Sequence, residues 1–153
     1  MADKRAVDKS HKKTILIVED DIDLASLWQK FLQSRGYVVD VCGRVDDAEI
    51  VIAGNRYDLL IVDIFFREGS TVLSKGGITL INRRRLREST ESGMERIKII
   101  AITGTPKRSF GQFDALDSVA RLSDLLQHKP IRLDTLAAIV EQVLSGDEIE
   151  EVN

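Results

Sequence analysis

The sequence predicts an α/β protein built on a doubly wound, five-stranded parallel sheet. Short runs of apolar and β-branched residues alternate along the chain with longer segments whose apolar residues recur at helical spacing. Strands that alternate with helices in this way form a parallel sheet with helices on both faces. The crossover connections of such a sheet are right-handed, which leaves few topologies to consider.

Each predicted strand is a short run of the residue types that buried parallel strands contain. The first and third runs, TILIV and LLIV, are the most continuously apolar, and the fifth, LLQH, is the least. The predicted strands are Thr14–Val18, Tyr37–Cys42, Leu59–Val62, Ile97–Ile102 and Leu125–His128.

The segments between and after these runs have helical periodicity and recognisable ends. Gly36 ends the first helix and Gly54 ends the second, as glycine commonly does. The predicted helices cover residues 24–32, 45–53, 78–87, 109–121 and 133–144. In the fourth helix the residues expected to face inward are Phe110, Phe113, Leu116 and Ala120.

The composition is that of one globular domain with two polar ends. The 153 residues can bury a core of their own, and a net charge of −3 argues against a protein that neutralises a nucleic-acid backbone. Its one cysteine, Cys42, excludes a disulfide within the chain. We expect a flexible basic tail at residues 1–13, a domain at 14–145 and an acidic tail at 146–153, without an output domain. We also expect a cytoplasmic protein, because no run is apolar enough for a membrane span or a signal peptide.

Polar residues stand where four of the predicted strands end. They are Glu19-Asp20-Asp21, Asp63, Thr103-Gly104 and Lys129-Pro130. Each has an ordinary structural explanation: Asp21 suits a helix N-cap, Asp63 a turn, and Lys129-Pro130 a helix start. Ligands of doubly wound sheets, however, bind beyond the carboxyl ends of the strands, where the strand order reverses. The combination therefore indicates a site at that edge of the sheet.

The residue types at these strand ends suit phosphoryl transfer. Carboxylates that lie close together repel one another, and a bound cation relieves the repulsion. An incomplete cage of oxygen ligands favours Mg²⁺, which takes the rest of its shell from water and phosphate. Asp63 could then attack a phosphoryl group in line. Lys129 would pair with one phosphoryl oxygen, and the Thr103 hydroxyl would donate to another.

Four segments together resemble the signatures of bacterial two-component receiver domains, in the order in which that family has them. They are ILIVEDD at Ile15–Asp21, LLIVD at Leu59–Asp63, IIAITG at Ile99–Gly104 and HKPI at His128–Ile131. The likeness runs from about Thr14 to Ser145 and implies a flavodoxin-like receiver fold. It implies that Asp63 is the phosphoacceptor, that Thr103 is the switch hydroxyl and that Lys129 is the family's lysine.

The same resemblance implies how magnesium would be held. Asp20 and Asp63 would be direct ligands, Glu19 would act through water, and Phe65 would give its backbone carbonyl. The family's partners would be a histidine kinase or histidine phosphotransfer protein and a downstream protein target. Neither nucleic acid nor membrane is expected as a partner, and a homodimer stays open. No catalysis is expected beyond Mg²⁺-dependent self-phosphorylation and self-dephosphorylation.

The sequence departs from the family pattern in three places. The segment 64–76 is about half a dozen residues longer than the family's connection, lacks its proline and precedes the helix-opening glycine, Gly77. Leu126 stands where an aromatic residue is common, and Leu122 stands where a small residue is usual. The first two departures favour a rival interpretation, a pseudo-receiver that binds a partner without being phosphorylated.

Other classes fit less well. A phosphatase or mutase of the aspartyl-phosphate type needs a carboxylate two residues after the nucleophile, where this chain has Phe65. A nucleotide-binding loop after the first strand would be rich in glycine. This chain has Glu19-Asp20-Asp21 there, whose negative charges would repel a phosphate. The basic run Arg83–Arg85 with Arg87 is interpreted as a solvated helix face rather than as a DNA-binding surface.

Overall fold

Five parallel strands form the centre of the protein in a computed structural model, which describes residues 11–68, 71–73, 76–104 and 112–146. They lie in the order β2-β1-β3-β6-β7, and every neighbouring pair is parallel. Their bounds are β1 Thr14–Val18, β2 Val38–Cys42, β3 Leu59–Asp63, β6 Lys98–Thr103 and β7 Leu125–His128. This is the doubly wound, flavodoxin-like order, so the predicted fold class is confirmed.

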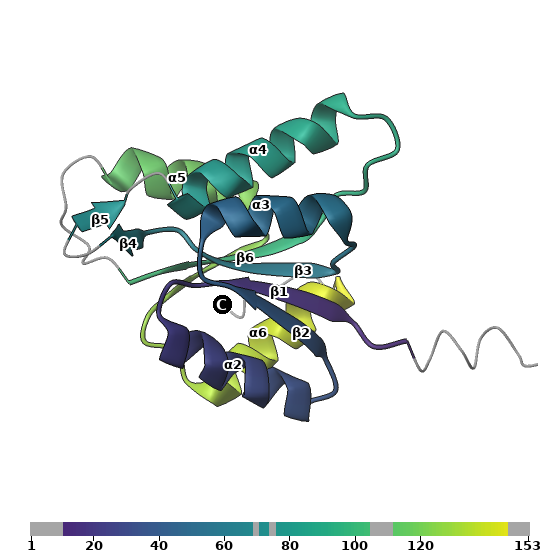
Figure 1. Cartoon of the computed structure of the whole chain (residues 1–153), viewed down its shortest axis with the longest axis vertical. Coiled ribbons are helices and arrows are strands. Elements are labelled where there is room, and N and C mark those ends of the chain that lie inside the picture. The colour runs from purple at the N-terminus through teal and green to yellow at the C-terminus, as the bar shows by residue number, and fades with distance from the viewer. Residues whose placement is uncertain (1–10, 69–70, 74–75, 105–111, 147–153) are drawn as a thin grey trace, which may run out of the picture.

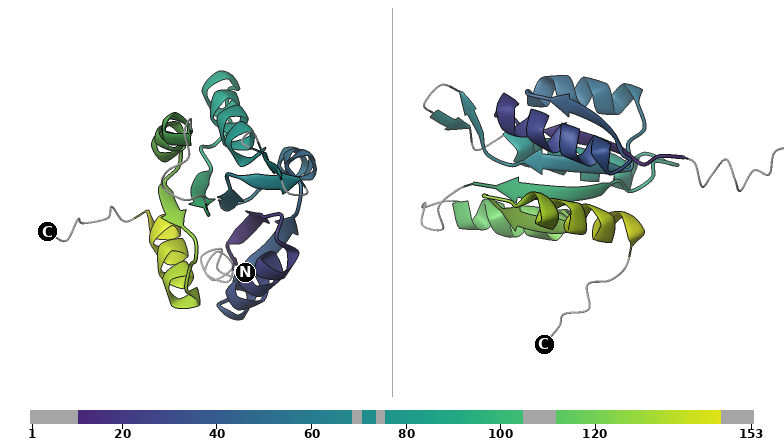
Figure 2. Two further views of the ribbon diagram at one scale, coloured as in Figure 1. Left: turned by 90° about the vertical axis from the view of Figure 1, so that its left-hand side faces the viewer. Right: turned by 90° about the horizontal axis from the view of Figure 1, so that it is seen from below.

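Helices cover both faces of the sheet (Figure 1). On one face lie α2 (Ile22–Ser34) and α6 (Leu133–Ser145), and on the other lie α3 (Val45–Gly54), α4 (Gly76–Thr90) and α5 (Gln112–Leu122). The end-on view in Figure 2 shows the sheet between these two helical layers. Among the described residues, no helix combines the length and the apolarity that crossing a membrane requires.

The alternation of side chains along each strand divides the core in two. In β1, Leu16 and Val18 pack toward α3, α4 and α5, while Ile15 and Ile17 pack toward α2 and α6. All five residues of β3 are buried, because this strand lies at the centre of the sheet with helices on both sides. The end of β3 is therefore fixed from both faces and by two neighbouring strands, which makes it a rigid place for a functional residue.

The predicted elements agree closely with those of the structure. The strand at β2 begins at Val38 instead of Tyr37, and each helix differs from its predicted range by at most a few residues. In α5 the inward face was predicted wrongly at Ala120, whose side chain is exposed, while its neighbour Val119 is 1% exposed. The other three predicted inward positions, and nearly all of the two predicted tails, lie outside the described side chains.

The segment 64–76 is not an unstructured connection. It contains β4 (Phe66–Glu68) and β5 (Thr71–Leu73), which pair antiparallel as a small separate sheet. In Figure 1 this hairpin projects beyond the end of β3, at the carboxyl edge of the main sheet. The prediction of a long loop here is corrected, since part of its added length forms a second sheet.

After the hairpin the chain enters α4, and Gly77 in the first turn of this helix lies against the end of β3. A β-carbon on Gly77 would overlap the carbonyl oxygen of Asp63 and would lie 2.7 Å from the Cα of Ile64. Only a residue without a side chain lets the first turn of α4 approach the backbone this closely. The assignment of Gly77 as the glycine that opens this helix agrees with that contact.

The basic run of α4 is only partly the solvated face that the sequence suggested, since Arg83 and Arg87 are exposed whereas Arg84 and Arg85 are not. Arg85 is only 10% exposed and donates to the backbone carbonyls of Leu122 and Ile97, both at 2.8 Å. Its guanidinium also pairs with Glu88 at 2.6 Å and with Asp124 at 3.3 Å. These bonds join the end of α4 to the start of β6 and to the α5–β7 connection, so Arg85 is a structural residue. Arg83 is different, because it remains 63% exposed.

The contact at Gly77 predicts a large loss of stability from one added methyl group. We expect Gly77→Ala to lower the free energy of unfolding by about 3 kcal/mol, because backbone must move to make room. Gly54→Ala is the matched control, since nothing lies within 4 Å of its β-carbon position. It should leave stability unchanged or raise it by at most about 1 kcal/mol. Urea unfolding of both variants measures the difference, and equal values would contradict the packing argument.

Arg85 and Arg83 give a second matched pair. Arg85→Ala should lower the free energy of unfolding by about 3 kcal/mol, because two partly buried carbonyls lose their donor and two carboxylates lose a cation. Arg83→Ala removes one exposed pair with Glu49, at 2.7 Å, and should cost about 0.5 kcal/mol or less. Chemical denaturation is again the measurement. A loss as small for Arg85→Ala as for Arg83→Ala would show that the network contributes little.

Candidate functional site

The polar residues at the strand ends meet at one edge of the sheet, as the sequence predicts. Asp63 is the last residue of β3, Thr103 is the last residue of β6, and Glu19 follows β1 directly. Lys129 follows β7, and its backbone N–H donates to the Thr103 carbonyl at 2.8 Å. All these strands are parallel, so their carboxyl ends lie together.

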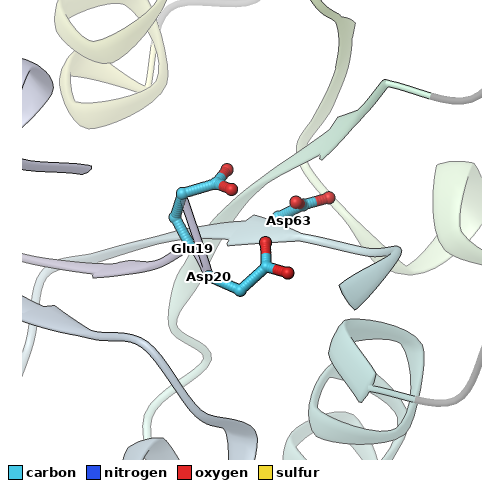
Figure 3. A group of neighbouring side chains, drawn as sticks. All are labelled: Glu19, Asp20 and Asp63. Carbon is cyan, nitrogen blue, oxygen red and sulfur yellow. The ribbon is translucent and has the colours of Figure 1, made fainter. Parts of the chain in front are cut away.

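Three carboxyl groups point toward one another at this edge (Figure 3). One oxygen from each of Glu19, Asp20 and Asp63 lies within 4.8 Å of the other two. Glu19 is 1% exposed and Asp63 is 4% exposed, whereas Asp20 is partly open to solvent. The cluster therefore concentrates negative charge in a place with limited hydration.

Lys129 provides the compensating charge. Its Nζ lies 2.9 Å from Glu19 Oε2 and 3.1 Å from Asp63 Oδ2, so one ammonium bridges two carboxylates from different strands. Gly104 makes room for this side chain, because a β-carbon there would lie 3.2 Å from the Lys129 Cδ. Such a bridge between buried charges depends on all its members, since removal of one partner leaves the others uncompensated.

The crowding is reflected in the pKa values of the three groups. Burial and the negative charge of Asp63 raise the pKa of Glu19 to about 8, against the opposing effect of Lys129. Burial also raises the pKa of Asp63, although Lys129 and the Phe65 N–H act in the other direction. Burial alone would lower the pKa of Lys129, but its contacts with Glu19 and Asp63 outweigh burial and raise it.

Backbone groups orient the carboxylates. The Asp21 N–H donates to Glu19 Oε1 at 3.1 Å, and the Phe65 N–H donates to Asp63 Oδ1 at 3.2 Å. The Asp21 side chain accepts from the Leu24 N–H at 3.1 Å and is the N-cap of α2, as its residue type suggested. Sequence reasoning could not find the two N–H donors, because every residue except proline offers one.

The remaining predicted site residues are placed as follows. Thr103 is 1% exposed at the end of β6, the strand that neighbours β3. Phe65 is 6% exposed, and its ring belongs to the core beneath α3, α4 and α5. Its suggested role is a backbone one, with which a buried ring is compatible. The alternative that Lys129-Pro130 starts a helix is wrong, because α6 begins at Leu133 with Arg132 as its N-cap.

The donor set fits a hard divalent cation. Glu19, Asp20 and Asp63 offer only carboxylate oxygens, and the described part of the chain brings no histidine or cysteine into their group. Oxygen ligands in an incomplete cage are what Mg²⁺ takes from proteins, and a 2+ charge would relieve the repulsion described above. The residues at this edge are thus compatible with magnesium, with Asp20 as the member most open to solvent.

Comparison with known proteins points to one family. A sequence model of the response regulator receiver domain matches residues 15–141. The phosphate regulon transcriptional regulatory protein PhoB of Rhizobium meliloti (strain 1021) is 32% identical over 130 residues, or 85% of this chain and 51% of PhoB. The transcriptional regulatory protein DltR of Streptococcus agalactiae is 31% identical over 124 residues, or 81% of this chain and 48% of DltR. The chain spans about half the length of these curated relatives.

Solved structures share the fold. A two-component response regulator from Clostridium difficile is 26% identical with a TM-score of 0.65, covering 88% of this chain and 97% of that one. A CheY-like receiver domain from Methylobacillus flagellatus is 22% identical with a TM-score of 0.66, covering 87% and 99%. The second likeness, at this low identity, supports the architecture and nothing finer.

The raised pKa of Glu19 predicts how stability depends on pH when no divalent cation is present. The unfolded chain releases this proton near the ordinary pKa of 4.5, while the folded chain keeps it to about 8. Between these values the folded state binds more protons, so the free energy of unfolding should fall as the pH rises. Thermal unfolding in EDTA between about pH 6 and pH 8 should show this fall in the wild type, and a shallower one in Glu19→Gln.

The same experiment with Mg²⁺ tests the site. Bound cation favours the ionised carboxylates, so Mg²⁺ should stabilise the wild type more at about pH 8 than at about pH 6. Asp20→Ala should lose most of this stabilisation. If Mg²⁺ stabilised Asp20→Ala as much as the wild type, the ligand assignment would be wrong.

Proposed function

This chain belongs to the response regulator receiver domain family, and on that basis we propose that it accepts a phosphoryl group on Asp63 and signals by protein contact. The donor would be a histidine kinase or a histidine phosphotransfer protein, both of which are partners of this family. The observation that carries the proposal is the convergence of Asp63 with Glu19, Asp20 and Lys129 at one edge of the sheet.

The chemistry follows from the positions of these side chains. An Asp63 carboxylate oxygen attacks the phosphorus as the bond from phosphorus to the donor's imidazole nitrogen breaks, and the imidazole keeps that electron pair. Lys129 is already within 3.1 Å of Asp63 and would turn to a phosphoryl oxygen. Thr103, at the end of the neighbouring strand, would donate its hydroxyl to another oxygen.

Magnesium would be held by Asp20 and Asp63 directly, by Glu19 through water and by the Phe65 carbonyl. When bound, it would offset the negative charge of the incoming phosphoryl oxygens. The magnesium ion would also take over part of the charge compensation that Lys129 now provides to Glu19 and Asp63. The lysine could then serve the phosphoryl group instead.

We place the protein in the cytoplasm, with a protein as its downstream target and no independent enzymatic activity beyond gaining and losing the phosphoryl group. The matched relatives are named as transcriptional regulators, and this chain covers about half of their length. Direct binding of nucleic acid is not part of the proposal, because Arg84 and Arg85 make ion pairs within the fold. The alternative is a pseudo-receiver that binds its partner unphosphorylated.

Phosphorylation by a small-molecule donor separates these two functions. With acetyl phosphate and Mg²⁺, intact mass should show one added phosphoryl group on the wild type and none on Asp63→Asn. Asp21→Asn is the matched control, since Asp21 adjoins the site but serves as a helix N-cap, a role that asparagine also fills. It should be phosphorylated like the wild type. A folded wild type that gained no mass would favour the pseudo-receiver.

A further inference from the structure

A second site lies at the edge of the sheet opposite Asp63. A pocket of about 660 Å³ opens there, between the α3–β3 connection, the α4–β6 connection, the residue before β1 and the first residue of β6. Figure 1 shows these starts of the strands at the far side of the sheet from the β4–β5 hairpin. The volume lies within the range of about 300–1,000 Å³ that small-molecule sites occupy.

The pocket carries a charge opposite to that of the chain. Its lining includes five cationic side chains and two carboxylates, a formal charge of +3 on a protein of net charge −3. They are Lys13, Arg56, Arg84, Arg96 and Lys98, with Asp58 and Glu95. Asp58 is already engaged, because its Oδ2 accepts from the backbone N–H and the hydroxyl of Thr14 at 2.8 and 3.1 Å.

The arginines are held in place by the protein itself. Arg84 is 14% exposed and is fixed by Glu88 at 3.0 Å and by the Glu95 carbonyl at 3.1 Å. Arg96 pairs with Asp124 at 2.7 Å while remaining 52% exposed. Arg56 pairs with Glu95 across the rim, where both side chains are largely exposed. Guanidinium groups positioned in this way keep free N–H donors for an incoming anion.

The two lysines differ from the arginines. Lys13 precedes β1 and Lys98 begins β6, and between these strands lies β3. Since neighbouring strands are about 4.8 Å apart, β1 and β6 are about 10 Å apart. Lys98 is in register with Leu59 and through it with Ile15, so Lys13 lies two residues farther along. Within the described part of the chain, no carboxylate forms an ion pair with either lysine. Two ammonium groups on either side of the start of β3, neither held in an ion pair among the described residues, can attract an anion.

Behind the charges the pocket is apolar. Ile52, Tyr57 and Ile97 line it, and each is only 5–7% exposed because it also belongs to the core beneath α3, α4 and α5. The Tyr57 hydroxyl is occupied with Asp40 at 2.7 Å, so its ring offers a surface and not a donor. An apolar floor beneath a cationic rim suits a molecule with a ring and phosphates, more than a bare inorganic ion.

We propose that this pocket binds a phosphorylated small molecule of nucleoside-diphosphate size. Its phosphates would lie between Lys13 and Lys98, with the arginine N–H groups at the rim, and its ring would lie on the apolar floor. This site is independent of the function proposed for Asp63 and lies at the other end of the sheet.

ADP is the probe, used in EDTA so that magnesium cannot bridge it to the carboxylates around Asp63. Calorimetry should show one ADP bound per chain, with adenosine binding at least about tenfold more weakly, because it lacks the charges that the lysines meet. The Lys13→Gln/Lys98→Gln variant should lose at least about tenfold in ADP affinity. The control Lys12→Gln/Lys30→Gln changes the net charge equally at exposed residues outside the pocket, and should bind ADP like the wild type.

Several results would overturn the proposal. One is equal affinity for ADP and adenosine. Another is an equal loss of ADP affinity in the two double variants, because that loss would reflect the net charge of the protein and not the pocket. Loss of binding in Asp63→Asn would place ADP at the phosphoacceptor. Binding that appears only when Asp147, Glu148, Glu150 and Glu151 are replaced by amides would show that the pocket serves acidic protein segments instead.

Discussion

The ion pairs of Lys129 with Glu19 and Asp63 are the interaction on which this molecule's chemistry depends. Two carboxylates that are almost entirely buried cannot remain ionised side by side unless a cation compensates them. The ammonium reaches both because β1, β3 and β7 end at the same edge of one parallel sheet. The buried apolar strands thus do more than stabilise the fold, since they hold the carboxyl groups of Glu19 and Asp63 within reach of one ammonium group.

The connection after β3 shows how the chain varies near this site without disturbing it. The β4–β5 hairpin is inserted between Asp63 and α4, yet Gly77 still rests against the Asp63 backbone. The insertion therefore projects from the edge of the sheet and leaves the core beneath it closed. The hairpin therefore adds surface at the edge of the sheet that carries Asp63.

Most of the architecture could be predicted because burial leaves a periodic trace in the sequence. The runs at β1 and β3 are almost entirely apolar since both of their faces are covered, and the polar residues at their carboxyl ends mark the edge of the sheet. The hairpin could not be foreseen, because three-residue strands are too short to show a period. Arg85 was misjudged for a different reason. A run of arginines has the composition of a solvated face, and only the fold reveals that the carbonyls of Ile97 and Leu122 lie within reach of one of them.

Helix α4 runs from the edge of the sheet at Asp63 toward the edge that carries the basic pocket. Its 15 residues extend about 22 Å, and Gly77 beside Asp63 lies about 12 Å along the helix axis from Arg85. The two ends are held by unlike forces. At Gly77 the helix is held by close packing against the backbone of Asp63, whereas at Arg85 four hydrogen bonds to carbonyls and carboxylates fix the helix. A group added to Asp63 would therefore displace the Gly77 end more easily than the Arg85 end, with Arg85 as the pivot.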